Sequence, residues 1–455
     1  MTERPGTITS TRALGVVSRR RFLAAAGGFA ALGLTGCSTG RFAGSGSEPV
    51  TTSATPATPA TPATGPTGTV TATTIPAGNG IAAVPGDRVL VVVNLDGGND
   101  AINTLVPESG RYHDLRPNLA LDPATLITHS SLGGHGLHPA LAPLQRHLDA
   151  GTLGVVAGVG FADPDRSHFV STDRWDRADR MDEQLGWAGR WLDTLDVELP
   201  PLGATAIGSD GRVLVGAERS GTAVGSVDAF AFPASVDHAD IRRLAGGGGT
   251  AATMTEPSDA LAAAARSAFL TSVGAVEDFD DIADAVRSSD GSASPRPSGP
   301  FGNGLALAAE LIRTNLDTRI VTVNVNGFDT HSAQLAQHAA LLDDLATGLD
   351  SFWSTLEASG DHERVMVITT SEFGRRAQEN SSAGSDHGSA GLSLVMGHTV
   401  SGGLHGSIDV GRLVDGDLAP MIDPRGIFTA ALDWVGGDVE RILGGRWDDV
   451  ALLRT

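Results

Sequence analysis

The sequence predicts an α/β protein with a mostly parallel central sheet flanked by helices. Helix-like and strand-like runs alternate along the 455-residue chain, which is long enough to bury a large core. The first strong strand, residues 87–96 (DRVLVVVNLD), is apolar on both faces and is therefore expected to be central and parallel. Polar residues directly follow several of the predicted strands, at the edge where open α/β sheets bind ligands.

The other elements follow from the spacing of the apolar residues. Leu141, Leu144 and Leu148 are spaced to face a core from a helix over residues 139–150. Short apolar, often β-branched runs are typical of buried strands. Such strands are expected over residues 154–160, 319–325, 365–368 and 392–396. Further helices are expected over residues 258–287 and 303–315, separated by a Ser/Pro/Gly loop over 288–300.

The charge balance restricts the partners of the protein. The chain has 32 basic and 53 acidic residues, and every basic residue is Arg. A strongly acidic protein does not suit a nucleic-acid or anionic membrane surface, so we expect no nucleic-acid partner.

The first 37 residues read as an export signal. Residues 18–23 (SRRRFL) match the twin-arginine pattern, and residues 22–36 form an apolar core that is short for a membrane span. Residues 34–37 (LTGC) resemble a lipobox, which predicts that Cys37 is lipidated. The alternative is a plain signal peptide with a chance cysteine. As the sole cysteine, Cys37 excludes an internal disulfide and a cysteine metal site.

The predicted signal is followed by a tether and a single domain. Residues 38–86 are rich in Thr, Pro and Ala and have little to bury, so we expect a disordered linker. Residues 87–455 then form the predicted α/β domain. We expect an exported protein on the outer face of the cell membrane, attached to that membrane through its N-terminal lipid alone.

Acids and imidazoles collect after four of the predicted strands, one of which, over 154–160, is followed by Asp163, Asp165 and His168. Asp96 ends the first strand, and Asp329 and His331 follow the strand over 319–325. The connection between the last two strands carries Glu372, Asp386 and His387. Carboxylates and imidazoles without a thiolate suit zinc, manganese, magnesium or calcium, as one or two ions. For Asp96 the structural alternative is a turn-forming residue.

Ser167 is the candidate nucleophile, because oriented N–H groups at the start of a helix favour an alkoxide or oxyanion. The alternative is that Ser167 or Asp165 is merely an N-cap. His338 reads as a surface or packing residue. No G-x-S-x-G motif is present, which argues against an α/β-hydrolase. No glycine run fits G-x-G-x-x-G, which argues against a dinucleotide fold.

Five motifs together resemble the bacterial family called domain of unknown function 1501, which belongs to the alkaline phosphatase-like superfamily. The motifs are DGGND at 96–100, RSHF at 166–169, GFDTH at 327–331, SEFGR at 371–375 and SDHG at 385–388. The resemblance covers roughly residue 87 to the C-terminus and implies an alkaline phosphatase-like fold. It implies a metal-dependent hydrolase of phosphate or sulfate esters, acting on a small molecule or on a glycan or lipid ester.

The resemblance also implies individual roles. Ser167 corresponds to the nucleophile. The implied metal ligands are Asp96, Asp329, His331, Glu372, Asp386 and His387. The residues that would bind the substrate are Asn99, Arg166, His168 and Arg375.

Two departures leave the activity open. Phe373 stands where the superfamily has a histidine, and the usual Asp-x-x-x-His spacing is shortened to Asp329-x-His331. One alternative is therefore a catalytically degenerate surface-binding or scaffold protein of the same fold. A second is a purely structural hydrogen-bonded network.

Overall fold

Strand β1 (Val89–Asp96) lies in the interior of the sheet, between two strands that are parallel to it. The computed structural model describes residues 87–226, 274, 276, 279–286, 299–314, 317–448 and 450–454, all of which belong to one compact unit. The predicted signal peptide over 1–37 and the tether over 38–86 lie outside the described residues. So do most of the helical region predicted over 258–287 and nearly all of the loop predicted over 288–300.

The main sheet has eight strands in the order β11-β5-β10-β9-β1-β8-β6-β7. Besides β1 these are β5 (Leu153–Val159), β6 (Ala204–Ile207), β7 (Thr222–Val224), β8 (Ile320–Asn326), β9 (Val365–Thr370), β10 (Gly391–Gly397) and β11 (Gly403–Gly406). Every neighbouring pair is parallel except the two pairs that β10 makes with β9 and β5. The prediction of a mostly parallel sheet is therefore confirmed, with β10 as its antiparallel member.

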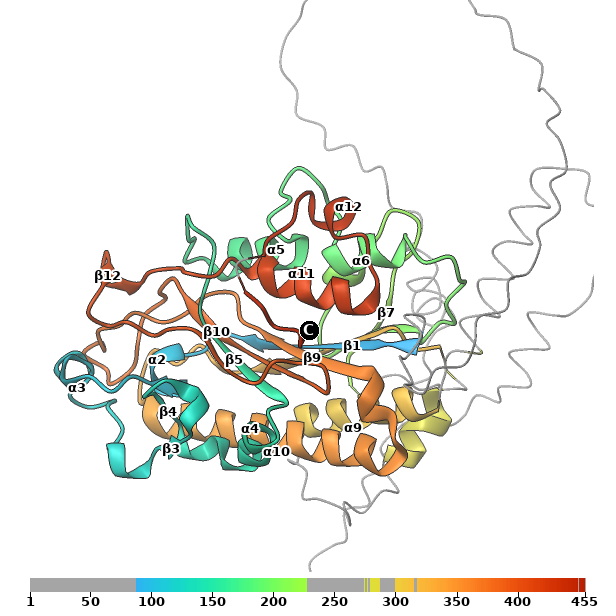
Figure 1. Ribbon diagram of the computed structural model, residues 1–455. Coiled ribbons are helices and arrows are strands. Elements are labelled where there is room, and N and C mark those ends of the chain that lie inside the picture. Colours follow the sequence, from blue (N-terminus) through green and yellow to red (C-terminus); the bar gives the residue numbers. More distant parts are fainter. Residues whose placement is uncertain are drawn as a thin grey trace, which may run out of the picture. The chain divides into compact units, whose positions relative to one another are not determined.

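Helices cover both faces of this sheet (Figure 1). On one face lie η5 (Pro139–Leu144), α4 (Gln145–Asp149), α9 (Pro300–Arg313) and α10 (Gln334–Ser359). On the other face lie α5 (His168–Arg177), α6 (Trp187–Leu192), α11 (Pro424–Val435) and α12 (Val439–Leu443). No helix among the described residues is both long and apolar enough to cross a membrane.

Smaller elements complete the connections. After β1 come α2 (Ala101–Thr104), β2 (Leu105–Val106), α3 (Gly110–Leu115), η3 (Pro123–Thr125), β3 (Ile127–Thr128), η4 (Ser130–Leu132) and β4 (Gly136–Leu137). Strands β2, β4 and β3 form a small sheet of their own. The later elements are η6 (Arg212–Leu214), η7 (Asp361–Arg364), β12 (Leu413–Val414) and β13 (Asp417–Leu418).

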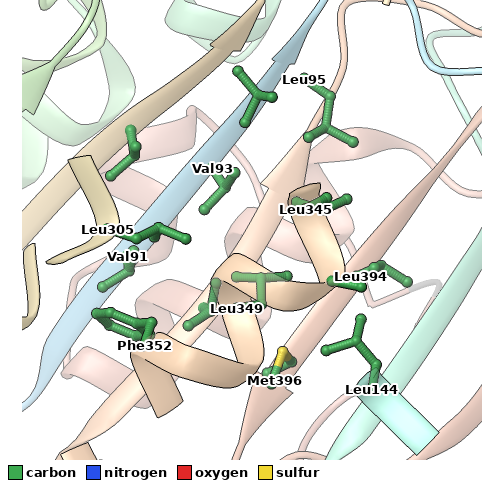
Figure 2. Close-up of a cluster of buried hydrophobic side chains, with 14 of the residues drawn as sticks. Val91, Val93, Leu95, Leu144, Leu305, Leu345, Leu349, Phe352, Leu394 and Met396 are labelled. Atoms are coloured by element: carbon green, nitrogen blue, oxygen red, sulfur yellow. The ribbon is translucent and has the colours of Figure 1, made fainter. Parts of the chain in front are cut away.

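The alternation of side chains along β1 explains its place in the sheet. Val91, Val93 and Leu95 enter the core beneath α9 and α10, where Leu349 and Phe352 meet them (Figure 2). Leu90 and Val92 point to the opposite face and join the core beneath α11. Because successive side chains of a strand alternate between faces, a strand that is apolar throughout must be covered on both sides.

One local prediction needs correction. The helix expected over 139–150 is a 3₁₀ segment followed by the short α4, and it contains Pro143. Proline has no N–H to donate and clashes with the preceding turn of an α-helix, so the first half winds differently. Strand β8 ends at Asn326, and Gly327 turns the chain at a φ of 112°. Asp329 and His331 therefore lie on a loop rather than on an extended strand.

Candidate functional site

The candidate site lies at the carboxyl edge of the three central parallel strands. Strands β1, β8 and β9 run in register, so that Asp96 pairs with Asn326 and Asn94 with Thr370. The chain segments that follow them therefore meet at one edge of the sheet, which is where α/β proteins bind their ligands.

Three imidazole nitrogens converge on the carboxylate of Asp329. Oδ1 of Asp329 lies 3.0 Å from Nε2 of His331 and 3.1 Å from Nε2 of His387. These two Nε2 atoms are 2.9 Å apart. Nε2 of His168 lies 3.5 Å from the other carboxylate oxygen, Oδ2. Ligand atoms of His168, Asp329 and His387 all lie within 4.8 Å of one another. We call these four residues the imidazole cluster.

Each imidazole is oriented by an acceptor at its other nitrogen. Nδ1 of His168 lies 2.8 Å from Oε1 of Glu372, and Nδ1 of His331 lies 3.2 Å from Oδ1 of Asp386. Nδ1 of His387 lies 2.8 Å from the backbone oxygen of Arg166. Carboxylates and carbonyls accept and do not donate, so each neutral ring carries its proton on Nδ1. The three Nε2 lone pairs then point at Asp329.

The carboxylate of Asp329 stays ionised across the ordinary pH range. Partial burial raises its pKa, but the hydrogen bond from Arg375, the contact with His387 and the charge of Arg375 outweigh burial and bring the pKa to about 2. The pKa of Asp386 is also lowered, chiefly by a hydrogen bond from Asn380 and then by the contact with His331.

Arg375 holds the loops of the site together and does not face a substrate. Its guanidinium is fully buried and donates to the backbone oxygens of Gly97, Gly98, Phe328 and Ser385 and to Oδ1 of Asp329. This placement does not fit the predicted substrate clamp. Buried carbonyls of tight turns need donors, and a guanidinium supplies several in fixed directions.

The two glycines after Asp96 allow this close packing. A Cβ on Gly97 would lie 2.2 Å from the backbone nitrogen of Asp329, and one on Gly98 would lie 2.4 Å from the ring of Phe373. Both have positive φ, which side chains rarely adopt. Phe373 is buried, with its ring centroid 4.5 Å from that of His387. The aromatic ring therefore packs against His387 of the imidazole cluster.

Ser167 is the N-cap residue of α5 and directly precedes His168 in the chain. Its backbone N–H donates to Oδ1 of Asp165 at 2.6 Å, and no side-chain capping hydrogen bond is made at this helix end. Within the described part of the chain the Ser167 hydroxyl therefore does not act as the helix cap that the structural alternative required.

Glu372 and Asp96 lie next to each other at the strand ends, but Glu372 is already engaged. Its Oε1 accepts hydrogen bonds from the Gly97 N–H at 2.9 Å and from His168. Both Asp96 and Glu372 line a pocket on the α5 side of the sheet. Asp386 likewise contacts an imidazole proton. Glu372 and Asp386 thus orient histidines, which is a different placement from the direct metal ligation that the resemblance implied.

Two other predicted substrate-binding residues have protein partners. Asn99 is almost wholly buried, and its Oδ1 accepts from Thr104 and His338. This placement does not fit a contact with substrate. Arg166 is 44% exposed at its side chain and pairs with the buried carboxylate of Asp417. His338 is buried and lies outside the imidazole cluster, so the surface alternative for it is wrong.

The sequence did not predict His168 as a member of the cluster. Two signals could have found it: His168 starts the helix after a buried strand, and Phe373 removes the imidazole expected beside Glu372. The structure brings His168 to that position from 204 residues away. The two segments come together because β5 and β9 run in the same direction on either side of β10, so that their carboxyl ends lie at one edge of the sheet.

The fold and the cluster define an α/β protein with a histidine–carboxylate site at the carboxyl edge of its sheet. Residues 221–445 match the model of the family described as "Protein of unknown function (DUF1501)", the family that the five motifs resemble. The match includes Asp329, His331 and His387, and it begins after Ser167 and His168.

The other comparisons add little. No curated protein matches the chain. A solved structure, the lipoteichoic acid synthase LtaP from Listeria monocytogenes, is similar over 77% of this chain and 72% of its own, at 9% identity and a TM-score of 0.29. A similarity at this level carries no argument about function.

Proposed function

We propose that this protein is a metal-dependent hydrolase of phosphate or sulfate esters. The observation that carries the proposal is the imidazole cluster, in which His331, His387 and His168 present Nε2 to the carboxylate of Asp329. Ser167, the N-cap residue of α5, directly precedes His168 in the chain.

The cluster fits a cation better than it fits hydrogen bonding alone. The Nε2 atoms of His331 and His387 are 2.9 Å apart, and the Nδ1 atom of each ring faces a hydrogen-bond acceptor. A neutral ring in this setting carries its proton on Nδ1 and leaves a lone pair on Nε2. Two lone pairs at this distance repel unless a cation lies between them. Ligands about 2.0–2.1 Å from a tetrahedral zinc are roughly 3.3 Å apart, close to the separations seen around Asp329.

The donor set also selects among metals. Three imidazoles and one carboxylate favour zinc or manganese over magnesium and calcium, which prefer oxygen ligands. The proposed ligands are Asp329, His331 and His387, with His168 completing the set. Glu372 and Asp386 raise the basicity of the histidines that they contact and fix their orientation.

The residues around the cluster suit transfer of a phosphoryl or sulfuryl group to Ser167. A divalent cation would lower the pKa of a nearby hydroxyl and neutralise charge on the transferred group. In this scheme the Ser167 oxygen bonds to phosphorus or sulfur while the ester alcohol leaves with a proton, and water later releases the acid. The N–H groups at the start of α5 and the exposed part of Arg166 stabilise the oxyanion.

Phe373 favours a second candidate, a degenerate binding protein that keeps the cluster without turnover. The buried ring stands where the superfamily has a further histidine. In addition, Oε1 of Glu372 already accepts hydrogen bonds from His168 and from the N–H of Gly97. These contacts support a site for one ion rather than the two-ion alternative.

The location is part of the proposal. The twin-arginine pattern and the lipobox ending at Cys37 support an exported protein anchored to the outer face of the membrane. Its substrate is then a small molecule or a glycan or lipid ester outside the cell. Labelling cells with a radioactive fatty acid tests this: Cys37→Ser should remove the label, and an unlabelled wild-type chain contradicts lipidation.

Metal content and turnover together test the function. Elemental analysis of the full chain after exposure to zinc or manganese should give about one ion per chain, and Asp329→Ala should give almost none. His398→Ala, an exposed histidine outside the cluster, is the control and should keep the ion. A wild-type chain that binds no divalent metal overturns the proposal.

Ser167→Ala separates the two candidates. In the hydrolase it keeps the ion and loses ester hydrolysis by a factor of at least about 10³. A metal-loaded wild-type protein that hydrolyses neither phosphate nor sulfate esters supports the degenerate binding protein instead.

A further inference from the structure

The central strands become polar on one face as they approach the candidate site. On the α5 side of β1 the apolar Leu90 and Val92 are followed by Asn94 and Asp96. Asn94 pairs in register with Asn324 on β8 and with Thr370 on β9. Its Nδ2 donates to Oδ1 of Asn324 at 2.7 Å, and Thr370 donates to Oδ1 of Asn94 at 3.3 Å. Three neighbouring strands thus share one polar row under a helix layer that is otherwise apolar.

This polar row forms the floor of a pocket of about 180 Å³. One face of α5 forms a wall, because His168, Thr172 and Asp176 are spaced four residues apart; Thr172 and Asp176 line the pocket. Glu372 also lines the pocket and receives the hydrogen bond of His168. The pocket therefore runs along α5 to Glu372, which contacts His168 of the imidazole cluster.

Two buried polar atoms in the pocket are unpartnered among the described residues. They are Oε2 of Glu372 and Oγ1 of Thr322, and each residue is only 5% exposed. A buried polar atom without a partner is unfavourable, and native proteins retain few of them. Both atoms can accept a hydrogen bond. A ligand that donates hydrogen bonds or carries positive charge would satisfy them.

The charge of the pocket points the same way. Its lining carries four carboxylates, from Asp96, Asp176, Asp210 and Glu372. Its one cation, Arg212, is paired with Asp173 and is half exposed. A surplus of negative charge in a recess favours a cationic ligand.

Asp176 responds to this crowding. Burial raises its pKa most, Arg212 and Arg177 lower it, and Asp210 and Asp173 raise it further, so that the pKa reaches about 7. A positive charge beside Asp176 would restore its ionised form.

Aromatic rings supply the rest of the wall. Trp175, Trp187 and Phe428 line the pocket, and the last two are stacked with ring centroids 4.6 Å apart. Aromatic faces beside carboxylates are the surroundings that ammonium groups prefer.

We infer that this pocket binds an ammonium group, the cationic end of an ester whose phosphoryl or sulfuryl end reaches Ser167. The part of this inference that concerns an ester rests on the proposed function; the binding of an ammonium ion does not. The expected substrates are then phosphate or sulfate esters of an amino alcohol. A neutral polyol ester of similar size lacks the positive charge and should bind more weakly.

Binding of choline to the full chain, measured by calorimetry at pH 8, tests the pocket without turnover. Asp176→Asn should weaken binding at least about tenfold, since one facing carboxylate is lost. Asp182→Asn removes an equal charge from an exposed residue outside the pocket and should bind like wild type. Circular dichroism establishes that each variant is folded. If Asp176→Asn does not fold, Asp210→Asn removes a different carboxylate of the pocket and should also weaken choline binding. Glycerol, a neutral probe, should not bind.

The outcomes separate this inference from the proposed function. Choline binding that survives Asp329→Ala supports the pocket even if the protein hydrolyses no ester. Ester hydrolysis with equal kcat/KM for choline phosphate and glycerol phosphate overturns the pocket and leaves the hydrolase standing. Two further results would overturn the pocket. One is binding of glycerol as tight as that of choline. The other is a chain that binds no choline but binds a divalent ion that is lost in Asp176→Asn.

Discussion

Two groups of histidines and carboxylates lie near the end of β1, and their polar atoms are used in opposite ways. The first is the imidazole cluster around Asp329. The second, which we call the buried network, surrounds Asp100, whose carboxylate accepts hydrogen bonds from Arg116, Gln334 and the N–H of Ile102. In the buried network the carboxylate of Asp100 meets donors and is closed off from water, although Nδ1 of His338 has no partner among the described residues. In the imidazole cluster three lone pairs meet one carboxylate at a partly exposed position.

The difference lies in the surroundings, since both groups contain the same residue types. Asp100 and Asp96 are four residues apart in one motif, yet the Asp100 carboxylate is fully buried against Arg116. Its burial raises the pKa, but the charge and hydrogen bond of Arg116 outweigh burial and lower it. A motif of acids and glycines at a strand end therefore contains both structural and site residues, and only the partners distinguish them.

Removing Arg116 should produce the largest loss of stability. Arg116→Met leaves the carboxylate of Asp100 buried without its partner and should lower the free energy of unfolding by about 3–5 kcal/mol. Urea unfolding followed by tryptophan fluorescence measures the change. Arg313→Met, which breaks the exposed pair with Glu310, is the control and should cost no more than about 1 kcal/mol. Equal effects of the two substitutions would contradict the assignment of Arg116 to a closed network.

How far the sequence predicts each group follows from the same contrast. Strand positions came from local apolar runs, and their ends located Asp329, His331 and His387 at one edge because parallel strands end together. The predicted role of Arg375 in binding substrate did not fit its placement. The sequence shows that a guanidinium lies near a site, but it does not show that the backbone oxygens of Gly97 and Gly98 accept its hydrogen bonds.

The contacts of Asn99 and His168 could not be predicted for a related reason, because their partners come from distant segments. Asn99 meets His338 from α10, and His168 meets Glu372 from the loop after β9. Periodicity fixes which face a residue occupies, but it does not fix which residue of another element stands opposite. The partners of Asn99 and His168 therefore depend on contacts between distant elements, which the sequence pattern does not give.

Acid should reveal the buried network through His338. Burial chiefly lowers the pKa of His338 to about 4, although the nearby charge of Asp100 raises it. Above pH 6.5 the imidazole is neutral in both the folded and the unfolded chain. Below that pH only the unfolded chain takes up the proton, so stability falls as the pH drops from 6.5 to 4, by up to about 3 kcal/mol.

Unfolding in urea at pH 7.5 and pH 5, with a chelator to remove any effect of bound metal, measures this loss. His338→Gln keeps an N–H donor for Asn99 and removes the titration, so its stability should change less between the two pH values. His398→Gln replaces an exposed histidine and should behave like wild type. A wild-type stability that does not fall at pH 5 would show that His338 becomes protonated in the folded protein.

The smallest predicted effect concerns Asp386, which contacts the imidazole cluster through a proton rather than through the proposed ion. Its Oδ1 accepts from Nδ1 of His331 at 3.2 Å and from Nδ2 of Asn380 at 3.1 Å. Asp386→Asn keeps the size of the side chain and removes its charge. It should weaken metal binding by about 10–100-fold without abolishing it, because an imidazole that donates to a neutral acceptor is a less basic ligand for the metal.

Competition with a chelator of known affinity measures this constant, and Asp409→Asn, an exposed acid away from the cluster, serves as the control. Stability without metal should change by less than about 1 kcal/mol, since Asp386 is more than half exposed at its side chain. A complete loss of the ion in Asp386→Asn would mean that Asp386 is itself a ligand, as the motif resemblance first implied. An unchanged metal affinity would remove Asp386 from the site and leave His331 to be oriented by the backbone of its own loop.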